Sequence, residues 1–137
     1  MTNHRILLVA LLLAIGLVVH STMTPSQPTQ AQDKPAVLLR HVVLFQFKPD
    51  VTKAQVQEVV DAFGALPKKI DAIAGYEWGT DVSVEMKAEG FTHCFIVSFK
   101  DAKARDSYLP HAAHAAFVKF VGPRIEKVLV FDFVNGK

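Results

Sequence analysis

The sequence predicts an α+β domain in which one antiparallel sheet carries helices on one face. Three observations predict this class. The 137 residues are 50 % apolar, which suits one domain with a sizeable core. Four segments alternate apolar and other residues with the period of a strand, and two regions between them have the period of a helix.

The first half of the domain is predicted to form a strand and a helix. Leu39 to Lys48 is rich in β-branched and aromatic residues and ends before Pro49, as expected of a strand. Thr52 and Gln55 have the spacing of a capping box. Apolar residues then follow at helical spacing, namely Val56, Val59, Val60 and Phe63. Pro67 limits this helix.

The second half supplies the remaining elements. A turn over 68–71 precedes a strand, Gly90 opens another, and Asp101 is a candidate helix N-cap. Pro110 breaks the helical region, and Gly122-Pro123 ends it. The predicted elements are strands over 75–82, 91–100 and 126–134 and helices over 101–109 and 111–121. The resulting order, βαββαβ, is the ferredoxin-like pattern with a four-stranded antiparallel sheet.

Apolar residues occupy both faces of the predicted strands. Val43, Phe45 and Val130 have the parity assigned to the helix side, whereas Phe131 and Phe133 have the opposite parity. Helices can cover one face only, so the other would be a large exposed apolar patch. We therefore expect a homodimer that packs sheet against sheet. Cys94 has the outward parity and is interpreted as a small apolar residue of that face.

The N-terminal region is interpreted as a targeting segment. Residues 6–19 are apolar or small, which is short for a membrane-spanning helix but typical of a secretory signal. Residues 1–32 are thus predicted to be a signal peptide and polar linker, and residues 33–137 the folded domain. We expect export to the periplasm or the extracellular space. The alternative is tethering to the membrane by an uncleaved N-terminal anchor.

Composition excludes several classes of function. The net charge of +2 and the lack of a basic patch argue against a nucleic-acid partner. One cysteine excludes an internal disulfide framework and a cysteine-cluster metal site. No phosphate-binding glycine loop or nucleophile elbow is present in the sequence. No membrane partner is expected beyond the N-terminal segment.

Five segments in order resemble the stress-responsive A/B barrel (Dabb) domain family. They are HVVLFQFK at 41–48, YEWGTDVS at 76–83, GFTHCFIVSF at 90–99, YLPHAAHAAF at 108–117 and EKVLVFDF at 126–133. The resemblance spans nearly all of the 33–137 domain and implies a dimeric α+β barrel. Most members of this family have no established reaction, so fold is implied more firmly than activity.

A polyketide cyclase of this family implies a set of site residues. It performs a cofactor-independent intramolecular aldol condensation. Its catalytic tyrosine and histidine fall on Tyr108 and His114, its two other pocket histidines on His41 and His93, and its pocket aspartate on Asp132. The apolar walls differ: this chain has Val59, Val60, Phe63, Ala112 and Ile125 where that enzyme has two phenylalanines, tyrosine, proline and tryptophan.

The residue chemistry suggests a role for each polar group. His114 would abstract a proton beside a carbonyl, Asp132 would orient its imidazole, and Tyr108 would donate to the developing enolate oxygen. No metal or organic cofactor is required. The ligand-binding residues are expected to be His41, His93, Val43, Phe45, Val59, Phe63, Val97, Ile125 and Val130.

Structural roles compete with these functional ones. His41 and His93 could be satisfied core residues, Tyr108 could close the core, and Trp78 is interpreted as a packing residue at the sheet edge. A zinc site formed by His111, His114 and a strand histidine is a further alternative. Two functions therefore remain. One is a module that binds a small apolar or carbonyl ligand or has a stress role, and the other is a cofactor-free cyclase, isomerase or lyase.

Overall fold

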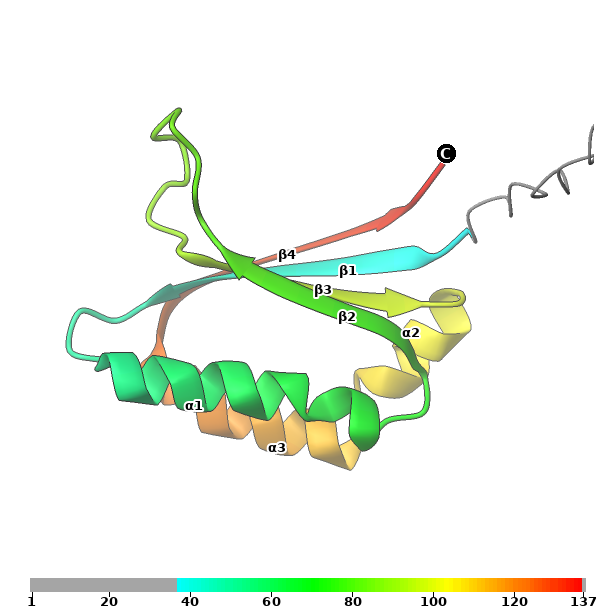
Figure 1. Cartoon of the computed structure of the whole chain (residues 1–137). Coiled ribbons are helices and arrows are strands. Elements are labelled where there is room, and N and C mark those ends of the chain that lie inside the picture. Colours follow the sequence, from blue (N-terminus) through cyan, green and yellow to red (C-terminus); the bar gives the residue numbers. More distant parts are fainter. Residues whose placement is uncertain (1–36, 137) are drawn as a thin grey trace, which may run out of the picture. The chain divides into compact units, whose positions relative to one another are not determined.

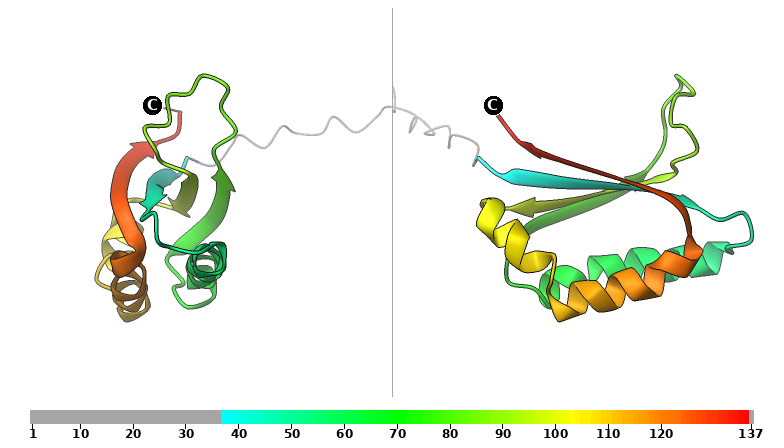
Figure 2. Two further views of the ribbon diagram at one scale, coloured as in Figure 1. Left: turned by 90° about the vertical axis from the view of Figure 1, so that its left-hand side faces the viewer. Right: turned by 180° about the vertical axis from the view of Figure 1, so that it is seen from behind.

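The computed structural model describes residues 37–136 and has the ferredoxin-like fold (Figure 1). The elements are β1 (Leu39–Phe47), α1 (Lys53–Gly64), η1 (Leu66–Lys68), β2 (Ile73–Thr80), β3 (His93–Phe99), α2 (Ala102–Tyr108), α3 (Ala112–Val121), η2 (Gly122–Arg124) and β4 (Ile125–Val134). The antiparallel strands lie in the order β2-β3-β1-β4, and the helices all cover one face of the sheet (Figures 1 and 2). The predicted fold class and element order are confirmed.

Local sequence signals explain where the helices begin. Thr52 caps α1 through a capping box with Gln55, as the spacing predicts. The side chain of Asp101 accepts a hydrogen bond from the backbone N–H of Ala104 at the start of α2. Pro110 separates α2 from α3, and the Nδ1 atom of His111 accepts the Ala113 N–H in place of a more usual capping oxygen.

The strand register confirms the predicted division of the two faces. In β1, Leu39, His41, Val43 and Phe45 are buried beneath the helices, and the residues between them are only partly buried. His41 lies opposite Asp132 and Val43 opposite Val130, which places these β4 residues on the helix side. The apolar residues of β4 with the other parity lie on the uncovered face, which we call the open face.

The core lies between the sheet and the helices. Val59 and Phe63 of α1 pack against Phe95 and Val97 of β3, and none of the four is more than 2 % exposed. The rings of Phe63 and Phe95 stack with centroids 4.6 Å apart. The open face instead exposes Leu129, Phe131 and Phe133, which are 43 %, 60 % and 42 % accessible.

Three regions differ from expectation: β2, β3 and the predicted turn. β3 spans His93–Phe99 rather than residues 91–100. β2 begins at Ile73 and ends at Thr80, two residues earlier at each end than predicted. The predicted turn over 68–71 is preceded by η1, which ends at Lys68 and accommodates Pro67 in its first turn. The predicted signal peptide and linker lie outside the described residues. Within residues 37–136, no helix is long and apolar enough to cross a membrane.

Candidate active site

An apolar cleft of about 480 Å³ lies on the helix side of the sheet, between β1 and β4 and helix α3. It opens along the edge strand β4, where Val128 and Val130 are 57 % and 55 % exposed. Three polar side chains converge on it, those of His41, Tyr108 and His114. Its apolar wall consists of Val43, Phe45, Phe63, Leu109, Phe117, Val118, Val121, Gly122, Ile125, Val128 and Val130, with Glu126 as the acidic member of the lining.

Tyr108 contributes a hydroxyl group that is buried and unpaired. It is the last residue of α2 and is fully inaccessible to solvent. Among the described residues its hydroxyl oxygen has no hydrogen-bond partner. Burial, together with the neighbouring Tyr76, raises the pKa of Tyr108, so the phenol keeps its proton at neutral pH. Tyr108 therefore presents an O–H donor.

His114 lies beside Tyr108, with ring centroids 4.2 Å apart. Its Nδ1 atom is 2.9 Å from the carbonyl oxygen of Leu109. Because a carbonyl can only accept, Nδ1 carries the proton and Nε2 keeps a lone pair in the neutral ring. Burial lowers the pKa of His114, the Leu109 carbonyl opposes this effect, and the nearby His41 and His111 lower it further. The neutral, basic form is thus favoured.

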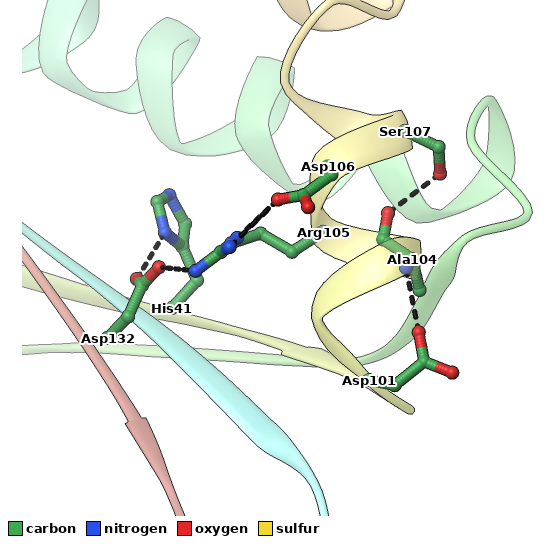
Figure 3. Close-up of polar contacts among 7 residues, drawn as sticks. All are labelled: His41, Asp101, Ala104, Arg105, Asp106, Ser107 and Asp132. Carbon is green, nitrogen blue, oxygen red and sulfur yellow. Dashed lines mark hydrogen bonds and ion pairs between the residues drawn. The ribbon is translucent and has the colours of Figure 1, made fainter.

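His41 is oriented by a carboxylate that is itself held by an arginine (Figure 3). The Nδ1 atom of His41 is 2.7 Å from Oδ1 of Asp132, and a guanidinium nitrogen of Arg105 is 2.8 Å from Oδ2. Arg105 also pairs with the adjacent Asp106 at 2.8 Å. His41 therefore donates through Nδ1–H, which fixes the tautomer that leaves Nε2 free.

The charge on Asp132 is stabilised by these neighbours. Burial raises the pKa of its carboxyl group, but the hydrogen bonds from Arg105 and His41 outweigh that effect and leave the pKa below its usual value. Asp132 is consequently ionised at neutral pH and accepts from both partners. The site combines two imidazoles with a free Nε2, one of them bonded to a carboxylate, and one phenol donor.

The expectation that Asp132 orients His114 is wrong. Its two carboxylate oxygens are bonded to His41 and Arg105, and the His114 Nδ1 atom is bonded to the Leu109 backbone. Asp132 faces His41 because the two residues are register partners on β4 and β1. His114 is directed differently because the break at Pro110 brings the Leu109 carbonyl to the start of α3.

Three of the expected ligand-binding residues do not line the cleft. Val59 and Val97 are completely buried in the core behind it. His93 is on the predicted face but pairs with Phe45 near the end of β1, remote from the His41–Asp132 pair. There it stacks on the exposed ring of Trp78, its Nδ1 atom is 2.9 Å from the Thr92 hydroxyl oxygen, and burial lowers its pKa. Trp78 does lie on the edge strand, as predicted.

Arg105 is the main site residue that sequence reasoning missed. A signal for it existed, because a carboxylate predicted on the inward face of a strand needs a partner. Helix α2, which lies on this face, offers two cations, Lys103 and Arg105. Several apolar wall residues on α3 were also missed; they are Phe117, Val118 and Val121.

The alternative of a three-histidine zinc site is not supported. Among residues 37–136, no group of three or more histidine, cysteine, aspartate or glutamate side chains is arranged to hold a metal ion. His111 uses Nδ1 to cap α3, and His114 uses Nδ1 on a carbonyl. Phe120 of α3 does not line the cleft and lies beneath the guanidinium group of Arg124, 4.2 Å from it.

The fold and site together define a ferredoxin-like α+β protein with a histidine- and tyrosine-lined cleft. One solved structure with this fold is a dimeric ferredoxin-like protein of unknown function from Thermobifida fusca. It is 23 % identical with a TM-score of 0.61, and the match covers 72 % of this chain and 92 % of that one. The chain belongs to the stress responsive A/B barrel domain (Dabb) family, whose sequence profile matches residues 39–135. The predicted family is therefore confirmed.

Two curated relatives are similar over nearly the whole domain. The stress-response A/B barrel domain-containing protein HS1 of Arabidopsis thaliana is 33 % identical over 95 residues, which cover 69 % of this chain and 87 % of that protein. Olivetolic acid cyclase of Cannabis sativa is 32 % identical over 99 residues, covering 72 % and 98 %. The relatives of this chain thus include a protein named for stress response and a cyclase.

Proposed function

We propose that this protein is a homodimer in which each subunit binds a small apolar molecule with an acceptor oxygen. The observation that carries the proposal is the Tyr108 hydroxyl, which is buried beside an apolar cleft and has no partner among the described residues. A carbonyl oxygen that accepts from this hydroxyl would satisfy it, because a buried polar group without a partner is unfavourable. The apolar wall would bury the remainder of the ligand.

The two histidines restrict further which chemical groups the ligand would carry. In their neutral forms His41 and His114 each keep a lone pair on Nε2. Such an atom accepts a hydrogen bond, so the ligand would also carry a hydroxyl group or an acidic C–H beside its carbonyl. Small aromatic ketones, phenols and β-keto compounds fit this pattern and the volume of the cleft.

A thermal-shift and calorimetric screen of these compounds tests the proposal. Tyr108→Phe should weaken binding about fivefold, the loss of one hydrogen bond, and His114→Ala should weaken it as well. Tyr76→Phe is the matched control, because the Tyr76 hydroxyl is also buried and unpaired but does not line the cleft. Binding that is indifferent to both Tyr108 and His114 would refute the proposed site.

Cofactor-free acid–base catalysis is the second candidate. The specific observation in its favour is the chain from His41 through Asp132 to Arg105, which fixes one tautomer of an imidazole that lines the cleft. An Nε2 atom of His41 or His114 would remove a proton beside the ligand carbonyl, and the Tyr108 O–H would donate to the enolate oxygen formed. The similarity to a cyclase is consistent with such chemistry.

Deuterium exchange at the methyl group of acetophenone in D₂O, followed by NMR, tests this candidate directly. The native protein should accelerate exchange over buffer. Loss of the acceleration in either His41→Gln or His114→Gln would identify the base, and retention of full activity in both variants would exclude catalysis by either histidine. His93→Gln serves as the control, since His93 lies outside the cleft.

The homodimer is supported by the open face. Leu129, Phe131 and Phe133 lie there exposed, beside partly exposed Val42 and Ile96. A contiguous apolar surface of this kind marks an interaction site. A protein with the same fold from Thermobifida fusca is described as dimeric. A second copy packed on this face would bury the patch.

Export is proposed from the sequence of the N-terminal region. Residues 6–19 have the length and composition of a signal-peptide core. Fractionation of cells that produce the full chain, followed by N-terminal sequencing, should recover a shortened protein outside the cytoplasm. A full-length protein in the membrane fraction would favour the uncleaved anchor.

A further inference from the structure

The loop between β2 and β3 forms a projecting arm with apolar side chains. Residues 81–92, here called the hairpin arm, rise from the sheet on the side opposite the helices (Figures 1 and 2). Val82, Val84 and Met86 of this arm are 88 %, 93 % and 90 % exposed. They alternate with the polar residues Ser83 and Glu85. Neither the cleft nor the core uses these apolar side chains.

Hydrogen bonds hold the arm in a defined position. The Thr92 N–H donates to the Phe45 carbonyl at 2.9 Å, and the Asp81 N–H donates to the Thr92 carbonyl at 3.0 Å. Further along, the Ser83 N–H donates to the Asp81 carboxylate at 2.9 Å. The base of the arm is thereby joined to the end of β1. These bonds anchor the two ends of the arm at the edge of the sheet.

We propose that the hairpin arm clasps a second copy of this chain. The inference rests on the homodimer proposed above and names the segment that contacts the partner outside the sheets. Sheets that pack face to face lie about 10 Å apart. Each leg of the arm has about five residues and can span up to about 16 Å. An arm beside the open face is therefore long enough to reach the plane of the partner's sheet.

Symmetry makes the contact reciprocal. In a twofold dimer each subunit presents the same surfaces, so both arms flank the opposite subunit. The three exposed side chains of each arm would be removed from water by the partner. The arms would thus add to the association that the open face provides and fix the orientation of the two sheets.

The charge of the arm favours a protein partner over a membrane surface. The arm contains Asp81, Glu85 and Glu89 but only one cation, Lys87. Segments that bind anionic lipid surfaces carry an excess of lysine and arginine. The arm has the opposite sign. It projects on the side of the sheet away from the helices (Figure 1), and the strand register places Phe131 and Phe133 on that same side.

Sedimentation velocity over a dilution series tests the proposal on the residue 33–137 domain and on the full chain. The variant Val82→Ser/Val84→Ser/Met86→Gln should raise the dimer dissociation constant about tenfold or more. Val118→Ser changes a 50 % exposed valine on α3, away from the open face, and should behave as the native protein. If the native chain dimerises and the arm variant dimerises equally tightly, the clasp is refuted and the homodimer stands. A native chain that stays monomeric refutes both.

Trypsin cleavage gives a second measurement that does not depend on a variant. Lys87 is the only lysine or arginine in the arm. Cleavage after Lys87, followed by mass spectrometry, should slow several-fold as the protein is concentrated into the dimer range. Equal rates above and below the dissociation constant would overturn the clasp. Flotation with phosphatidylglycerol vesicles gives a further test. If the native chain floats with the vesicles, the arm variant does not, and the two dimerise equally tightly, the clasp is also overturned.

Discussion

Tyr108 is an unusual buried residue because of the state of its hydroxyl group. Its hydroxyl has lost water without gaining a partner in the described part of the chain. Tyr108→Phe should therefore leave the free energy of unfolding unchanged or raise it by up to about 1 kcal/mol, unlike most substitutions of a buried tyrosine. Urea denaturation of the unliganded protein measures this. A loss of more than about 1 kcal/mol would mean that the hydroxyl has a stabilising partner.

His114 should make stability depend on pH. Its pKa is lowered in the folded protein, chiefly by burial, so the unfolded chain binds a proton more readily. Stability is then complete above the unfolded pKa of about 6.5 and declines as the pH falls below that value. His93 has a pKa shifted in the same direction and contributes the same sign.

Urea midpoints at pH 7.5 and pH 5.5 measure this dependence. The native protein should lose stability on acidification, His114→Gln should lose less, and His93→Gln combined with His114→Gln less still. If the double variant loses as much stability between pH 7.5 and pH 5.5 as the native protein does, groups other than His93 and His114 cause the pH dependence.

Sequence parity located Asp132 correctly but not its partner. Alternation along β4 was enough to place this carboxylate on the helix side, and the register confirms it opposite His41. The choice between His41 and His114 depended on where Pro110 directs the start of α3. It also depended on Arg105 reaching across from α2. Neither of these is encoded in the spacing of residues within one element.

At the scale of elements, the hairpin arm depends on Gly90. This residue has φ +86°, and a Cβ atom there would lie 2.8 Å from the Gln46 side chain. Gly90→Ala should reduce the free energy of unfolding by about 1–2 kcal/mol because the backbone conformation is unfavourable for a side chain. Urea denaturation measures the change. Gly79→Ala, where a Cβ meets nothing within 4 Å, is the matched control and should have little effect.

The position of His93 illustrates what periodicity within one strand cannot provide. Its face was predicted correctly, yet it lies outside the cleft. The pairing of β1 with β3 sets His41 opposite Val97 and Phe45 opposite His93. The two histidines are thus four residues apart along the sheet, or roughly 13 Å at the rise of a strand. Register between distant strands determines this separation, and alternation alone does not reveal it.

At the scale of the whole molecule, one sheet performs two tasks. The helix side forms the core and the cleft, and the open face presents apolar residues outward. This division was predictable because three of the four strands, β1, β3 and β4, have apolar residues on both faces, and helices on one side cannot cover both. The arm's direction was not, since it follows from the bonds of Asp81 and Thr92 at its base.

The last prediction concerns the open face itself. Phe131 is 60 % exposed at its centre, between Leu129 and Phe133. In a sheet-to-sheet dimer, Phe131→Glu would bury a carboxylate in an apolar interface, which costs several kcal/mol without a partner. The variant should therefore be a monomer or aggregate when the native protein is a dimer by light scattering. Val118→Glu places the same charge on α3, on the other side of the sheet, and should remain dimeric. A Phe131→Glu protein that still dimerises would show that the subunits meet elsewhere.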